Sequence, residues 1–113
     1  MFDKFKSLHI AVLGDLILDE YIYGDVQRIS PEAPIPIVRL QNKEWRPGGA
    51  ANVALNLHNL GIRTSLIGVN GDDKNGNKLN ALIESICLTG QTKLCRIDKR
   101  ITTCKTRVIA QNQ

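Results

Sequence analysis

The fold is decided by the stretch Arg46-Pro47-Gly48-Gly49-Ala50-Ala51-Asn52-Val53-Ala54. Its two adjacent glycines lack a Cβ atom, so a ligand or another part of the chain can approach the backbone closely. Apolar residues then recur at helical spacing, at Ala50, Val53, Ala54, Leu57 and Leu60. Gly61 follows them and is expected to end the helix. The pattern predicts a Gly-Gly turn that opens a helix, whose first free N–H groups can hold a ligand. Close packing of the helix is the other use that such glycines have.

The segments on either side of this helix have the composition of strands. Residues 8–14 form a short apolar run that ends in glycine, which is typical of a strand buried on both faces of a parallel sheet. Residues 63–69 form a second run of this kind. A strand, a helix and a strand at this spacing predict a right-handed βαβ unit. Because no charged residue lies between residues 48 and 60, we expect the helix to be covered on most sides.

Two carboxylates follow the first predicted strand. Asp15 and Asp19 come just past its expected end, and ligands bind at that end of the strands in open α/β sheets. Both side chains could accept hydrogen bonds from sugar hydroxyls. A turn or a helix cap is the alternative role for each of them.

Residues 21–40 differ from their surroundings. Residues 21–25 and 35–40 are predicted to be strands, and Pro31, Pro34 and Pro36 belong at edges or in turns because proline donates no ladder hydrogen bond. We therefore expect a small antiparallel β segment with its tip near residues 28–34. Such a segment can close over a substrate or pair with a second copy of itself. Trp45 is expected to pack beneath it.

The second half of the chain continues the α/β pattern. Residues 70–73 form a turn with helix-cap residues, and apolar residues from Leu79 to Cys87 predict an amphipathic helix that ends at Gly90. Residues 92–97 and 102–110 are predicted to be strands. Lys105 and Arg107 alternate along the last one and so share a face, which either binds a ligand or is solvated.

Composition excludes several classes of protein. The net charge of +4 comes without a dense basic block, and aromatic residues make up 4%, so nucleic-acid binding has little support. No apolar run reaches the ~20 residues of a membrane span, and the N-terminus does not resemble a signal peptide, so we expect a cytoplasmic protein. Three cysteines without a Cys-x-x-Cys pair indicate reduced, mostly buried thiols and no zinc site. The chain is not a dinucleotide-binding domain, because no Gly-x-Gly-x-x-Gly motif follows its first predicted strand.

Four stretches together resemble one known family. They are Gly14-Asp15-Leu16-Ile17-Leu18-Asp19, Arg28-Ile29-Ser30-Pro31-Glu32-Ala33-Pro34-Ile35-Pro36, the Arg46 to Ala54 stretch, and Thr103-Cys104-Lys105-Thr106-Arg107. The chain resembles the N-terminal part of a ribokinase-family (PfkB-type) sugar kinase, most closely the heptose-7-phosphate kinases of ADP-heptose synthesis. The second stretch carries the likeness to the heptose kinases. The resemblance implies a ribokinase-like α/β fold with a mostly parallel sheet, flanking helices and an antiparallel β lid at about residues 20–45.

The resemblance also implies roles for individual residues. Asp19 matches the carboxylate that binds sugar hydroxyls, and Gly48, Gly49 and Asn52 match the segment that holds the sugar. Lys105 and Arg107 stand where basic residues could meet the phosphate of a sugar phosphate. The lid is also the contact between the subunits of a homodimer in such kinases.

The family's catalytic aspartate, in a Gly-Ala-Gly-Asp motif, has no counterpart in the 113 residues. We therefore expect residues 1–113 to be part of a carbohydrate kinase domain. The catalytic base and the sites for ATP and Mg²⁺ would lie outside this chain. Two alternatives remain open: a non-catalytic remnant that at most binds a sugar phosphate or dimerises, and a kinase of the same family for another sugar.

Overall fold

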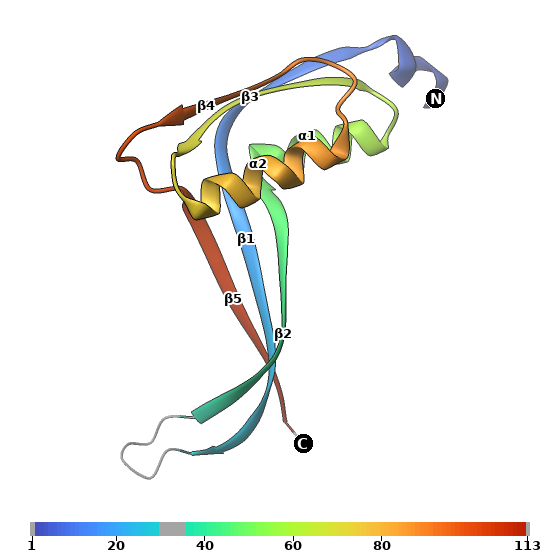
Figure 1. The fold of residues 1–113 in the computed structure, drawn as a ribbon. Helices are drawn as coiled ribbons and strands as arrows, with labels where there is room; N and C mark the ends of the chain where they lie inside the picture. Colours follow the sequence, from blue (N-terminus) through green and yellow to red (C-terminus); the bar gives the residue numbers. More distant parts are fainter. Residues whose placement is uncertain (1, 30–35, 113) are drawn as a thin grey trace.

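The computed structural model describes residues 2–29 and 36–112, which form two helices and five strands after a short 3-10 helix, Phe2–Ser7 (Figure 1). The elements in chain order are β1 His9–Ile29, β2 Pro36–Gly49, α1 Ala50–Asn59, β3 Arg63–Gly71, α2 Lys74–Ile86, β4 Thr92–Ile97 and β5 Thr103–Asn112. The predicted tip of the lid near residues 28–34 lies mostly outside the described residues.

Strand β1 belongs to two sheets. Its first part pairs in parallel with β3, from His9 opposite Arg63 to Asp15 opposite Val69, and β3 pairs in parallel with β4. The rest of β1 pairs antiparallel with β2 and parallel with β5. The βαβ unit and the mostly parallel α/β fold are thus confirmed.

Two details of the strand predictions are wrong. The first strand does not end at Gly14, because its backbone stays extended through Asp15 and Asp19 into the lid. Both carboxylates therefore lie within β1 and not beyond it. The lid is also not purely antiparallel, since β5 adds a parallel neighbour to β1 on the side away from β2.

The first part of β1 forms with β3 and β4 what we call the upper sheet, and both helices pack on the same face of it, as Figure 1 shows. The core between helices and strands consists mainly of Leu16, Leu18, Ala51, Ala54, Leu66, Leu79 and Ile83. Alternate residues of β1 point the other way, and Leu13 is 70% exposed. The expectation that residues 8–14 are buried on both faces is therefore wrong, because within the described residues no helix covers the second face.

Helix α1 is covered on one side only. Ala50, Ala51 and Ala54 are buried, whereas Asn52 and Val53 are exposed. The expectation of a helix covered on most sides is wrong, since asparagines supply a polar outer face without charge. The end of the helix is as predicted. Gly61 takes a φ of 84°, and the N–H of the next residue bonds back to the carbonyl oxygen of Leu57.

Helix α2 begins at a cap that also holds the start of β5. The Asp73 carboxylate accepts hydrogen bonds from Gly76 N (2.8 Å), Thr102 N (2.9 Å) and Thr102 Oγ1 (2.6 Å). These bonds lower the pKa of Asp73, because they favour the charged carboxylate. The helix ends at Ile86, followed by Cys87 as a C-cap residue in the left-handed conformation, and not at Gly90 as predicted.

The cysteines have no disulfide bonds among the described residues. Cys87 and Cys95 are exposed and Cys104 is partly exposed, so the expectation of mostly buried thiols is wrong. Neither helix of the described chain is long and apolar enough to cross a membrane.

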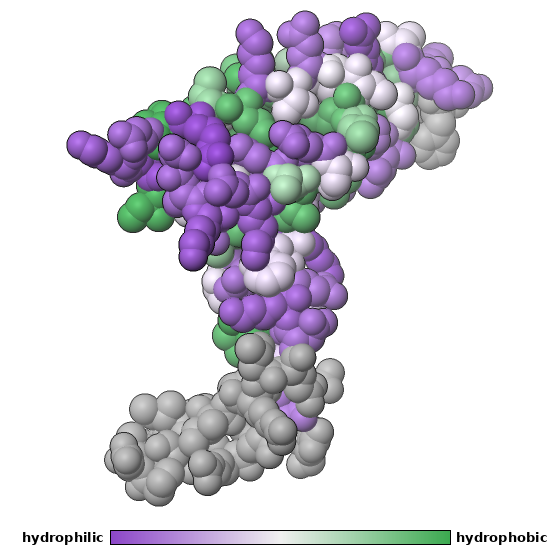
Figure 2. Space-filling view, viewed as in Figure 1, coloured by the Kyte–Doolittle hydropathy of each residue, from purple (hydrophilic) through white to green (hydrophobic). Residues whose placement is uncertain are grey.

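The molecule is elongated, with extents of 59 × 39 × 18 Å and a radius of gyration of 17.9 Å. A compact domain of this length would have a radius of about 13 Å. The difference arises because the lid strands project from the body that the helices form with the upper sheet. Figure 2 shows hydrophilic residues over much of that body, with hydrophobic residues between them.

Candidate functional site

The centre of the site is the contact between Asp19 on β1 and Gly48 on β2. Asp19 is partly buried and Gly48 is buried. A Cβ atom added to Gly48 would lie 2.6 Å from Asp19 Oδ2, so the carboxylate lies directly against the glycine backbone. Only glycine leaves room for the carboxylate in this position. The structure therefore brings together two residues that lie 29 positions apart in the sequence.

The turn into α1 depends on Gly49. This residue has a φ of 58°, and a Cβ atom there would lie 2.5 Å from the carbonyl oxygen of Asp15. Gly49 is the N-cap residue of α1 and, lacking a side chain, supplies no capping hydrogen bond. The first N–H groups of α1 therefore have no side-chain cap at this residue. Asn52 lies in the first turn of the same helix and is exposed.

The predicted basic residues lie beside Asp19 on β5. Lys105 is directly opposite Asp19 in the parallel ladder, and Arg107 is opposite Tyr21. Paired residues in a sheet point to the same side, so both basic side chains share the face that carries Asp19. Both are exposed. We call this side of the β2–β1–β5 sheet the Asp19 face.

Arg46 is a further residue of the site that was not among the residues predicted from the sequence. Arg46 pairs with Asp19 from the β2 side, so it too lies on the Asp19 face. Its guanidinium lies over the ring of Tyr21 at 4.7 Å, and that of Arg107 lies 5.9 Å from the same ring. Alternation along the strand before the Gly-Gly turn could have placed Arg46 on the face of Gly48.

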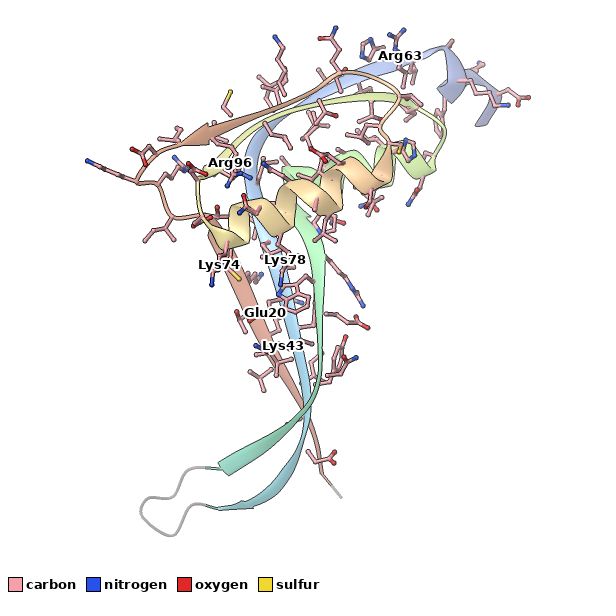
Figure 3. All side chains as sticks on the ribbon, viewed as in Figure 1. Glu20, Lys43, Arg63, Lys74, Lys78 and Arg96 are labelled. Carbon is pink, nitrogen blue, oxygen red and sulfur yellow. The ribbon has the colours of Figure 1, made fainter. Side chains whose placement is uncertain are left out.

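The opposite side of the same strands contacts α2 (Figure 3). Trp45 Nε1 donates a hydrogen bond of 2.9 Å to Glu20, and Thr106 Oγ1 donates one of 3.1 Å to the same carboxylate. Lys78 of α2 lies 3.3 Å from the centroid of the Trp45 ring. The Trp45 bond is the largest of the interactions that lower the pKa of Glu20. Trp45 thus packs beneath the lid strands, as expected.

The Asp19 face is open. The described residues enclose no pocket on it or elsewhere. Nor do any three His, Cys, Asp or Glu side chains among them come close enough to hold a metal ion. The part of the chain in the structure can therefore present groups to a ligand from one side.

The arrangement of strands and helices is that of the ribokinase-like class. A carbohydrate kinase from Agrobacterium tumefaciens matches with a TM-score of 0.67 at 19% identity, over 91% of this chain and 32% of that one. Phosphofructokinase-2 from Escherichia coli matches with a TM-score of 0.65 at 21% identity, over 92% and 31%. At such identities the likeness establishes the fold alone.

The sequence comparison identifies the family. Residues 7–113 match the model of the pfkB family carbohydrate kinases, and the chain belongs to this family. Its relatives include the bifunctional protein HldE of Coxiella burnetii, 45% identical over 109 residues, which are 96% of this chain and 22% of that protein. The HldE of Magnetococcus marinus is 55% identical over 82 residues, 72% of this chain and 17% of that one. The chain spans about a fifth of the length of these relatives.

Proposed function

We propose that this chain supplies the sugar-binding face and the lid of a heptose-7-phosphate kinase. The reaction transfers the γ-phosphoryl group of ATP to the anomeric hydroxyl of D-glycero-D-manno-heptose 7-phosphate. The observation that carries the proposal is the Asp19 carboxylate held against Gly48, next to the uncapped start of α1. The likeness of residues 28–36 to heptose kinases and the HldE relatives favour a heptose as the sugar.

In this proposal Asp19 accepts hydrogen bonds from sugar hydroxyls, and Asn52 with the backbone at Gly48 and Gly49 holds the other side of the sugar. A carboxylate orients a hydroxyl well because a charge-assisted hydrogen bond is about twice as strong as a neutral one. Orientation is a large part of phosphoryl transfer, where the protein mainly positions the reactants and stabilises charge. The base, ATP and Mg²⁺ would be held by residues beyond this chain.

The lid would both cover the sugar and join two subunits. Val108 is 57% exposed and Ile109 is 39% exposed, and both lie on β5, at an edge of the described lid sheet. An exposed apolar strand edge is suited to pairing with another chain. Sedimentation equilibrium of the natural protein tests this part, and a monomer at micromolar concentration would contradict it.

The activity is tested by incubating the natural protein with MgATP and each of three acceptors: heptose 7-phosphate, fructose 6-phosphate and ribose. We expect ADP release with the heptose phosphate and a new phosphate on its anomeric carbon by ³¹P NMR. Asp19→Ala should abolish turnover, whereas Asp98→Ala, in the exposed turn before β5, is the matched control and should retain it. Turnover of ribose in place of the heptose would overturn the assignment of the sugar. Absence of turnover with all three would favour a non-catalytic remnant.

A further inference from the structure

The Asp19 face carries two kinds of charge at two different places. Asp19 lies next to Gly48 and the start of α1. One repeat farther along β1, about 7 Å away, the ring of Tyr21 lies beneath two guanidinium groups. Arg46 reaches the ring from β2 and Arg107 from β5, so the two cations approach the central strand from both sides.

Two more charged residues lie on this face next to Asp19 and Tyr21: Glu44, opposite Tyr21, and Lys105, opposite Asp19. Farther along β1, Asp25 shares the same side of the strand and is buried. Arg46 forms an ion pair of 2.9 Å with Glu44, but the two side chains are 57% and 44% exposed. Exposed pairs contribute little, roughly 0–1 kcal/mol, so an anionic ligand can displace Glu44 from Arg46 at small cost.

We propose that Arg46 and Arg107 together bind the phosphate of the sugar-phosphate substrate, and that Arg46 makes the kinase select a phosphorylated sugar. This inference rests on the proposed function, because it assumes that Asp19 holds the sugar hydroxyls. The planar fork of each guanidinium matches two phosphate oxygens. The Tyr21 ring supports both forks from below and limits their rotamers, which reduces the entropy lost on binding.

The placement of the charges fits such a substrate. The carboxylate suits the hydroxyl end of the molecule, and the two arginines suit its phosphate end. Asp19 and Tyr21 are one strand repeat apart, and this separation of about 7 Å is comparable to the length of a sugar. A sugar without a phosphate would leave the guanidinium groups with the contacts that they have here to Tyr21 and Glu44, and would gain no ion pair from them.

The test compares binding of heptose 7-phosphate and of the unphosphorylated heptose to the natural protein by isothermal titration calorimetry. Arg46→Gln should weaken binding of the phosphorylated sugar about 10- to 100-fold, the range for losing charge-assisted hydrogen bonds. Binding of the unphosphorylated sugar should stay within about twofold. Arg46→Lys should fall between, because an ammonium keeps the charge but not the fork. This variant also decides the question if Arg46→Gln does not fold.

Arg63→Gln is the matched control. Arg63 is an exposed arginine opposite His9, and Figure 3 shows it at the far end of the molecule from the lid strands. His9 lies ten residues before Asp19, the partner of Arg46, which is about 33 Å along β1. Its substitution should change neither affinity. Selective loss in Arg46→Gln alone supports the inference.

Three results would overturn the inference. Equal loss of both ligands in Arg46→Gln would mean that Arg46 only packs on Tyr21 and supports the sheet. Unchanged affinities would mean that it does not contact the substrate, while the proposed function would stand. If the unaltered protein binds neither heptose, the proposed function fails together with the inference.

Discussion

Replacing Gly48 with alanine would place a methyl group where the carboxylate of Asp19 lies. The added Cβ atom would be 2.6–2.8 Å from all three carboxylate atoms, whereas ordinary contacts begin at 3.4 Å. Gly48 has no positive φ, so alanine can adopt its backbone conformation. The carboxylate, which is the end of a side chain, must therefore rotate away while the backbone stays in place.

The size of the effect follows from what Asp19 does. If it holds sugar hydroxyls, its displacement loses hydrogen bonds to a charged group worth about 1.5–3 kcal/mol, which corresponds to roughly 10- to 150-fold weaker sugar binding. Stability should change by less than about 1 kcal/mol, since glycine-to-alanine replacement restricts the unfolded chain and offsets part of the strain. Gly48→Ala should thus affect binding far more than stability.

Gly61→Ala provides the opposite case. Gly61 has a φ of 84° and no atom within 4 Å of an added Cβ, so the variant suffers only the cost of a left-handed alanine, about 1–2 kcal/mol. It should melt earlier and bind sugar normally. The assay is calorimetric titration of the sugar phosphate alongside urea denaturation of the natural protein and each variant.

A double-mutant cycle tests whether Gly48 affects sugar binding through Asp19. Gly48→Ala should cause no further loss of binding in an Asp19→Ala background, because its effect passes through the carboxylate. Additive losses would show that Gly48 contacts the sugar by itself. Normal binding by Gly48→Ala alone would show that the carboxylate is not needed where the structure has it.

Three more outcomes are expected. Leu66→Ala, at a fully buried site in β3, should lower the free energy of unfolding by about 2–5 kcal/mol in urea denaturation. The folded-state pKa of Asp73 lies below its ordinary value of 3.8, so the stability that this carboxylate contributes is present above that value and is lost as the pH falls through the lower folded pKa. Asp73→Asn should therefore make the free energy of unfolding fall less steeply at acidic pH. An unchanged acid dependence would contradict the role of the hydrogen bonds to Thr102. Trp45 is the single tryptophan and donates a hydrogen bond to Glu20, so its fluorescence should change with pH as Glu20 is protonated, below the ordinary glutamate pKa of 4.5. Glu20→Gln should remove this transition. A transition that persists in the variant would mean that another group causes it.

Local patterns predicted the elements better than their burial. The helix after Gly49, its end at Gly61 and the parallel pairing around it follow from spacing and from the special conformations of glycine. Burial was misjudged at Leu13 and Val53, because an apolar or uncharged pattern indicates what a residue can pack against and not whether a neighbour is present.

The site was only partly predictable, for a related reason. Asp19 and Gly48 could be singled out one by one, but the contact between them depends on the register of β1 and β2. The convergence of Arg46 and Arg107 on Tyr21 needs the pairing of three strands, two of them far apart in sequence. Such pairing is set by tertiary structure and leaves no local signal.

The long strand β1 also has a consequence for how the chain is made. Its outer part is completed by β5, whose residues follow their partners by 86 positions, as for Glu20 and Thr106. Strand β5 begins 54 positions after β2 ends (103 − 49), a stretch that the ribosome covers in roughly 3–11 s at about 5–20 residues per second. During this interval the nascent pair of β1 and β2 has one unpaired edge, open to any extended peptide nearby. Translation speed across residues 50–103 should therefore influence the yield of correctly folded protein.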